Sequence, residues 1–385
     1  KTSDEVASVL IFVVIMLGGF AQSGQAQSNQ FSWQPCVICR APIRISYFLI
    51  IFFGYRLLTS QANDFHLSIF LLICGQQAIL MATVLCHEFG HGTMARMIGG
   101  EIDHILLWPF GGICFSTRPP GVTDPQKVLE NELKIVAAGP STHFLMTPVW
   151  VLLLWAFGEI VTHSCPAEAC LSCSGLGCVQ SWLNPLGSPA VYYVNEKGVP
   201  LMGKWSALLW ELLGLGVQMN VALFLFNVFF PMYPADGSKL LTTSLMFFCG
   251  VSARLAALVL ICCSTVCAIL FIGYSAYSLW GGVAAGSSSS AMMAILMGYM
   301  GLMSLVEAYR LFQLREQRLL HQHPLFQIAR SGIATRRDGM GLVTTFNQQN
   351  LDDPPEFDLP QAPKSLWCCS WCIPSVQSPG DESDD

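Results

Sequence analysis

The sequence predicts an all-α polytopic membrane protein with about six or seven transmembrane helices. Hydrophobic residues make up 53% of its 385 residues and charged residues only 11%, whereas about a quarter of a typical soluble domain is charged. The mean hydropathy of +0.51 points the same way. Several apolar runs also approach or exceed the roughly 20 residues that a helix needs to cross the hydrocarbon core. Together these observations exclude an ordinary soluble domain.

Apolar segments that are candidate membrane spans occur along most of the chain, at 6–20, 42–59, 65–95, 134–158, 205–230, 250–280 and 290–309. The first of them, VASVLIFVVIMLGGF, is short enough to be either a membrane span or the apolar part of a signal sequence. Length alone does not decide between these two readings.

The positions of Lys and Arg predict how the spans are oriented, because these residues favour the cytosolic side. The last span ends in EAYRLFQLREQR, so its C-terminal end should be cytosolic. Counting backwards places the loop 159–204 outside and the segment 96–133, with its basic residues, inside. A cleaved signal at 6–20 would invert this order, and we therefore expect that segment to be a retained span.

A shorter apolar stretch, HILLWPFGGICFST at 104–117, lies between the third and fourth candidate spans. It is too short to cross the membrane, and Pro109, Gly111 and Gly112 favour a turn. Non-helical backbone is tolerated at membrane depth only where protein or a watery cavity covers it. We therefore expect a re-entrant hairpin.

The span at 65–95 contains a cluster of polar residues, in the sequence CHEFGHGTMAR (86–96). His-Glu-x-x-His on a helix places His87 and His91 on one face, where they can bind one Zn²⁺, with Glu88 beside them as a general base. Ionisable residues at membrane depth are costly and usually mark a functional site. The alternative is a pair of structural histidines bonded to the backbone or to each other.

A third zinc ligand is expected, because catalytic zinc usually takes three protein ligands and a water. The motif lies at the cytosolic end of its span, so this ligand should come from another cytosolic end. Asp236 is the only acid in NVFFPMYPADGSKLL (227–241), where Pro231 and Pro234 stop the fifth span. Alternatively, Asp236 merely caps the helix that starts near Ser238. We predict that Asp236 binds zinc.

Several motifs together resemble the site-2 protease family of membrane-embedded zinc metalloproteases. They occur in the family's order over roughly residues 65–245, as HEFGH within a span, WPFGG after it, AAGPSTH at 137–143 and NxxxPxxPxDG at 227–237. One departure is that the chain continues DGS where the family often reads DGG.

The resemblance implies roles for individual residues. His87, His91 and Asp236 would be the zinc ligands, with the hairpin close to the zinc site. Glu88 would be the catalytic base, and Asn227 a polar group near the substrate or the oxyanion. The expected activity is hydrolysis of peptide bonds in or near transmembrane segments of membrane proteins, as in regulated intramembrane proteolysis.

The expected partners are transmembrane protein substrates and the lipid bilayer. Nucleic acid is not expected, because no basic patch with interleaved aromatic residues is present. A membrane zinc transporter is the alternative from another class, although transporters should carry further intramembrane ligands along a path. A catalytically inactive, chaperone-like relative is a third reading, which the intact zincin motif argues against. We favour an endomembrane such as the ER or Golgi as the location.

Other residues near the motif allow two readings each. The hairpin could pair with an extended substrate segment through its strand edge, or it could be a plug that shields the zinc. His143 could bond to a zinc ligand or serve in packing. The polar side chains within spans could line a water path or bond between helices; these are Gln76, Gln77, Asn220 and Asn227.

Cysteines are unevenly distributed. The predicted outside loop carries Cys165, Cys170, Cys173 and Cys178, for which disulfides are expected and a second zinc site is the alternative. The tail sequence WCCSWC (367–372) is a candidate for S-palmitoylation.

We divide the chain into N-terminal membrane segments, a catalytic membrane core, C-terminal transmembrane helices and a disordered cytosolic tail. Their respective boundaries are 1–64, 65–245, 246–310 and 311–385.

Overall fold

The fold was analysed in a computed structural model of the chain. The structure describes residues 32–326, apart from 61–65, 110, 118–121, 123, 165–181, 184–203, 234 and 286–287. The predicted first span at 6–20, the loop cysteines Cys165 to Cys178 and the tail sequence at 367–372 therefore lie outside the described residues.

A small sheet covers one side of the helices. Its strands are β1 (Ser32–Ile38), β2 (Ala41–Ser46), β3 (Ile102–Trp108) and β4 (Gly111–Ser116), and they lie in that order across the sheet. The pair β2–β3 is parallel, and the pairs β1–β2 and β3–β4 are antiparallel. The prediction of an all-α protein is therefore wrong for these residues. The stretch 104–117 does form a hairpin, as expected, although its re-entry into the membrane stays a prediction.

The sheet forms because its strands have apolar side chains to bury against the helix that carries the zincin motif. Ala41, Ile43 and Ile105 are buried in one cluster with Val84 of that helix. Strand β2 takes up the start of the predicted span 42–59. The helix that follows, α3 (Tyr47–Ser60), has 14 residues, which is fewer than the roughly 20 needed to cross a membrane.

The remaining described elements are helical. They are α4 (Leu67–Met97), α5 (Pro125–Ser141), α6 (His143–Ser164), α8 (Lys204–Phe229), α9 (Asp236–Phe248), α10 (Ala253–Ala285) and α11 (Ser288–Glu316), followed by the 3₁₀ turns η1 (Leu320–Gln322) and η2 (Pro324–Phe326). Four described segments are long and apolar enough to cross a membrane: 67–97, 125–160, 205–229 and 253–280. The chain is thus a mostly helical polytopic membrane protein, and the predicted count of six or seven spans stays a prediction.

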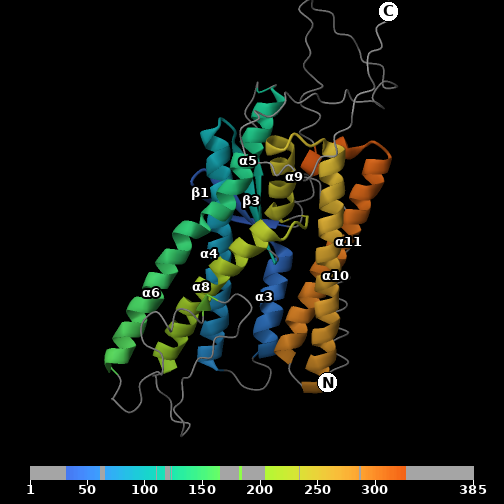
Figure 1. Cartoon of the computed structure of the whole chain (residues 1–385). Coiled ribbons are helices and arrows are strands. Elements are labelled where there is room, and N and C mark those ends of the chain that lie inside the picture. Colours follow the sequence, from blue (N-terminus) through green and yellow to red (C-terminus); the bar gives the residue numbers. More distant parts are fainter. Residues whose placement is uncertain are drawn as a thin grey trace, which may run out of the picture.

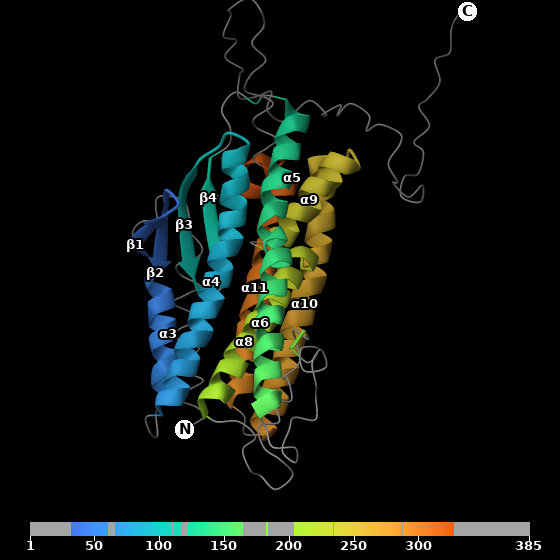
Figure 2. The same cartoon turned by 90° about the vertical axis from the view of Figure 1, so that its left-hand side faces the viewer.

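The helices form a bundle whose ends agree with the predicted alternation (Figure 1). The C-terminal ends of α4 and α11 lie at the same end of the bundle as α9 and the start of α5. Figure 2 shows the sheet beside the upper half of α4, with α3 continuing below it. The hairpin β3–β4 and the zincin motif therefore lie at the same level of the bundle.

The chain remains folded beyond residue 310, where the C-terminal transmembrane helices were predicted to end and a disordered tail to begin. Helix α11 continues to Glu316, and the two 3₁₀ turns fold back against α10. Leu320 and Phe326 are buried there in a cluster with Leu260. The predicted tail 311–385 thus begins with a packed segment.

Candidate metal centre

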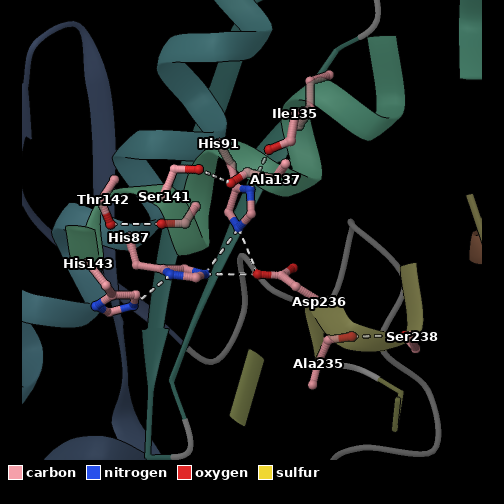
Figure 3. Close-up of polar contacts among 11 residues, drawn as sticks. His87, His91, Ile135, Ala137, Ser141, Thr142, His143, Ala235, Asp236 and Ser238 are labelled. Atoms are coloured by element: carbon pink, nitrogen blue, oxygen red, sulfur yellow. Dashed lines mark hydrogen bonds and ion pairs between the residues drawn. The ribbon is translucent and has the colours of Figure 1, made fainter. Parts of the chain in front are cut away.

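Two histidines of α4 and one aspartate of α9 meet inside the bundle. His87 and His91 are four residues apart, so both imidazoles lie on one face of the helix, and both are buried. The Nε2 atoms of the two rings are 3.2 Å apart. Asp236 Oδ2 lies 2.8 Å from Nε2 of His87 and 3.0 Å from Nε2 of His91 (Figure 3).

Asp236 reaches the histidines because the chain turns sharply between α8 and α9. Ser264 of α10 donates a hydrogen bond to the carbonyl oxygen of Pro231 and holds this turn. A Cβ on Gly237 would overlap the backbone oxygen of Phe230, so only glycine allows such a close return. Helix α9 has Ala235 at its N-cap, with no side-chain cap. The carboxylate of Asp236 therefore faces the histidines and does not act as the helix cap.

The hydrogen-bond partner of His91 identifies which of its nitrogens carries the proton. Its Nδ1 lies 2.7 Å from the carbonyl oxygen of Ile135 on α5, and a carbonyl can only accept. Nδ1 of His91 therefore carries the hydrogen. In the neutral ring, Nε2 then presents its lone pair to Asp236 and His87.

A series of hydrogen bonds from Asn220 through His143 shows that Nδ1 of His87 also carries the hydrogen. Asn220 donates from Nδ2 to the carbonyl oxygen of Gly216 at 2.8 Å, which turns its Oδ1 toward Nδ1 of His143 at 3.0 Å. Nδ1 of His143 therefore carries the hydrogen, and its Nε2 accepts from Nδ1 of His87 at 3.2 Å. In the neutral ring of His87, the lone pair again lies on Nε2.

Three electron pairs thus point at one position, from His87 Nε2, His91 Nε2 and Asp236 Oδ2. Converging lone pairs in a buried site require a cation. Two imidazoles and one carboxylate suit zinc and leave a fourth coordination position open. Among the described residues, this is the one group of three or more His, Cys, Asp or Glu side chains placed to hold a metal ion.

The charge on Asp236 also fits a cation site. Burial alone would raise the pKa of its carboxyl group, but when protons on His91 and His87 stand in for the metal ion, their positive charge and hydrogen bonds outweigh burial and hold that pKa below its usual range. The carboxyl group is therefore ionised and can only accept.

Glu88 lies beside the ligands without being one of them. It is buried and follows His87 directly, so the helix turns it toward the sheet. A Cβ on Gly112 of β4 would lie within 2.8 Å of Glu88 Oε1, so the backbone of the edge strand passes directly over the carboxylate.

The other polar residues predicted from sequence take different places. Gln76 accepts a hydrogen bond from Arg56 of α3, which matches a bond between helices. Asn220 and His143 form the bonds described above. Asn227 is partly buried near the end of α8, and its predicted role stays a prediction. The pairing of Asn220 with His143 was missed, although Asn220 and Asn227 share one face of an apolar helix.

Comparison with known proteins gives a family match over the same region. Residues 76–270, about half of the chain, match the model of peptidase family M50. The zinc metalloprotease MJ0392 of Methanocaldococcus jannaschii is 30% identical over 164 residues, which cover 39% of this chain and 45% of that protein. The chain therefore spans less than half of this relative's length. The solved structure of the site-2 protease from Methanocaldococcus jannaschii aligns with 71% of this chain and 95% of its own, with 18% identity and a TM-score of 0.40.

Proposed function

The chain belongs to peptidase family M50, as the resemblance to site-2 proteases predicted, and we propose that it is an intramembrane zinc metalloprotease. Its reaction is hydrolysis of peptide bonds in or near the transmembrane segments of other membrane proteins. The observation that carries this proposal is the convergence of three lone pairs beside the buried carboxylate of Glu88, in a helix apolar enough to span a membrane.

The ligands and the base have separate tasks in this reaction. His87, His91 and Asp236 hold the zinc, which supplies a Lewis acid for the scissile carbonyl and lowers the pKa of water to about 7. Glu88 takes a proton from the attacking water and passes it to the leaving amine. Its position next to His87, outside the ligand set, leaves its carboxylate free for that transfer.

The substrate segment has a place to bind along the edge of the sheet. Strand β4 is an edge strand of the described sheet, and an edge strand can pair with an extended peptide through main-chain hydrogen bonds. Because Gly112 of β4 lies against Glu88, a segment added to this edge would have its backbone near the base. We propose this pairing in preference to a purely shielding role for the hairpin.

The metal transporter is the weaker candidate. A transport path needs successive ligand groups, and within the described part of the chain one such group is found. An inactive chaperone-like relative would not need Glu88 beside the metal ligands. The expected location in an endomembrane such as the ER or Golgi stays a prediction, and the archaeal relative lends it no support.

The test is cleavage by the purified chain in lipid vesicles. Candidate single-span proteins are incubated with the chain, with the chain plus a zinc chelator, and with the chelated chain after zinc is returned. We expect cleavage in the first and third samples only. Zinc flux across the vesicle wall without any cleavage would favour the transporter instead.

A further inference from the structure

His143 and Asn220 are buried polar residues that neither bind the metal nor transfer a proton in the proposed reaction. We propose that they form a positioning pair, which fixes the orientation and the tautomer of His87 so that its Nε2 lone pair points at the metal. This inference rests on the zinc site of the proposed function and extends it to two further residues.

The geometry gives each polar atom of the pair a single role. The bonds run from His87 on α4 to His143 at the start of α6 and on to Asn220 on α8, and they end at a backbone carbonyl. His143 is 2% exposed and Asn220 is 0% exposed, so both residues are shielded from bulk water. Because Asn220 donates to the carbonyl oxygen of Gly216, its Oδ1 must face His143. This fixes which atom donates and which accepts in each of the following hydrogen bonds.

The alternative is that the two residues merely fill space between the helices. Buried polar groups are costly unless they are bonded, and an apolar side chain would fill the same space without that cost. The ring of His143 lies directly behind a metal ligand, with its centroid 5.2 Å from that of His87. A partner behind a ligating histidine usually fixes its tautomer and ring orientation.

The choice of neutral partners follows from the charge of the site. A divalent cation is balanced by two carboxylates, those of Asp236 and Glu88. A third carboxylate behind His87 would add an unbalanced negative charge within the membrane, where an unpaired charge is costly. His143 accepts the Nδ1–H of His87 while staying neutral, and His91 likewise donates to a neutral carbonyl, that of Ile135.

Three substitutions of His143 separate positioning from packing. In His143→Gln, the side-chain Oε1 can take the place of Nε2 and accept from His87. In His143→Asn, the shorter side chain reaches only the place of Nδ1, next to Asn220. In His143→Leu, both bonds are lost but the volume is largely kept.

The measurement is the affinity of each purified, folded variant for Zn²⁺ alone, by competition with a chromogenic chelator. We expect His143→Leu and His143→Asn to bind zinc about 10- to 100-fold more weakly, the usual effect of losing the partner of a ligating histidine. His143→Gln should retain most of the affinity. Asn220→Leu should weaken zinc binding when it is introduced alone. It should add little to the effect of His143→Leu, because the effects of substitutions in one hydrogen-bond network are not additive.

His323→Gln is the matched control, because it alters another fully buried histidine, bonded to Glu307 away from the metal. It should lower stability and leave zinc affinity unchanged. Wild-type affinity in His143→Leu and His143→Asn, or an equal loss in His143→Gln, would overturn the positioning role while leaving the zinc site standing. A wild-type chain that binds no zinc would overturn the proposed function together with this inference.

Discussion

The imidazole of His91 lies against the α-carbon of Gly139, with no room for a methyl group between them. A Cβ built at Gly139 would overlap Nε2 and Cε1 of His91. The same helix turn offers the carbonyl of Ile135, which accepts from Nδ1 of His91. Helix α5 therefore orients this ligand in two ways, by a hydrogen bond and by its surface shape.

Gly139→Ala should weaken the metal site. The added methyl group must either rotate His91 or push α5 away, and each movement breaks the bond to Ile135. Overpacking of this kind costs about 1–3 kcal/mol, and we expect zinc affinity to fall about tenfold or more. Zinc competition measures the fall. Gly273→Ala on α10, where an added Cβ meets no atom within 4 Å, is the control and should bind zinc normally. Equal affinity in the two variants would refute this role of Gly139.

Asp236→Asn should lose zinc while the fold remains. The amide has nearly the shape of the carboxylate but no charge, so the site loses its anionic ligand. Zinc content after dialysis against a weak chelator should drop from about one ion per chain to near zero. Ser238→Ala is the control, because Ser238 Oγ bonds only within its own turn, to Ala235. An Asp236→Asn protein that retains zinc and activity would remove Asp236 from the site.

Gly112→Ala should reduce cleavage without removing zinc. Its methyl group would press on the carboxylate of Glu88 and displace the base or the edge strand. The metal ligands are untouched, so zinc content should match that of the wild type. Cleavage of a single-span substrate is compared with that by Ser116→Ala, on the same strand. An unchanged rate in Gly112→Ala would show that β4 does not need this close approach.

His323→Leu should destabilise the packed segment after α11. His323 is 0% exposed and its Nε2 lies 2.9 Å from Oε1 of Glu307, so the substitution leaves the partly buried carboxylate of Glu307 without this partner. A loss of about 1–3 kcal/mol in unfolding free energy is expected, measured by denaturant titration in detergent. Gln322→Ala, at the exposed neighbouring position, should not change it. Equal stability of the two variants would contradict the importance of this contact.

The sequence predicted best those features that depend on local spacing. His87, Glu88 and His91 form a helical motif, and Asp236 follows from the need for a third ligand at the same depth. The structure brings the three predicted ligands together, and their binding of zinc stays a prediction. Strand β2 was missed because APIRIS runs into YFLII without a polar break, so the two read as one apolar span.

Tertiary contacts could not be predicted from spacing. His143 and Asn220 are 77 positions apart, and only the packing of α6 against α8 brings them together. Likewise, the charges after residue 309 predicted the end of the last span, but helix α11 continues to Glu316. Leu311 of this helix and Leu320 beyond it are buried in one cluster with Leu260 of α10. Periodicity and charge give the depth of a residue, whereas its partner depends on the assembled fold.

The role of Glu88 as the catalytic base beside a zinc ion is tested by Glu88→Gln, measured for zinc content and for cleavage of a single-span substrate in lipid vesicles. Glutamine keeps the size of the side chain but cannot take up a proton, and the three ligands are unchanged. We expect a folded, zinc-loaded protein whose cleavage rate is about 10²–10⁴-fold lower, the usual contribution of general acid–base catalysis. A folded, zinc-loaded Glu88→Gln protein that cuts the substrate at the wild-type rate would contradict this role.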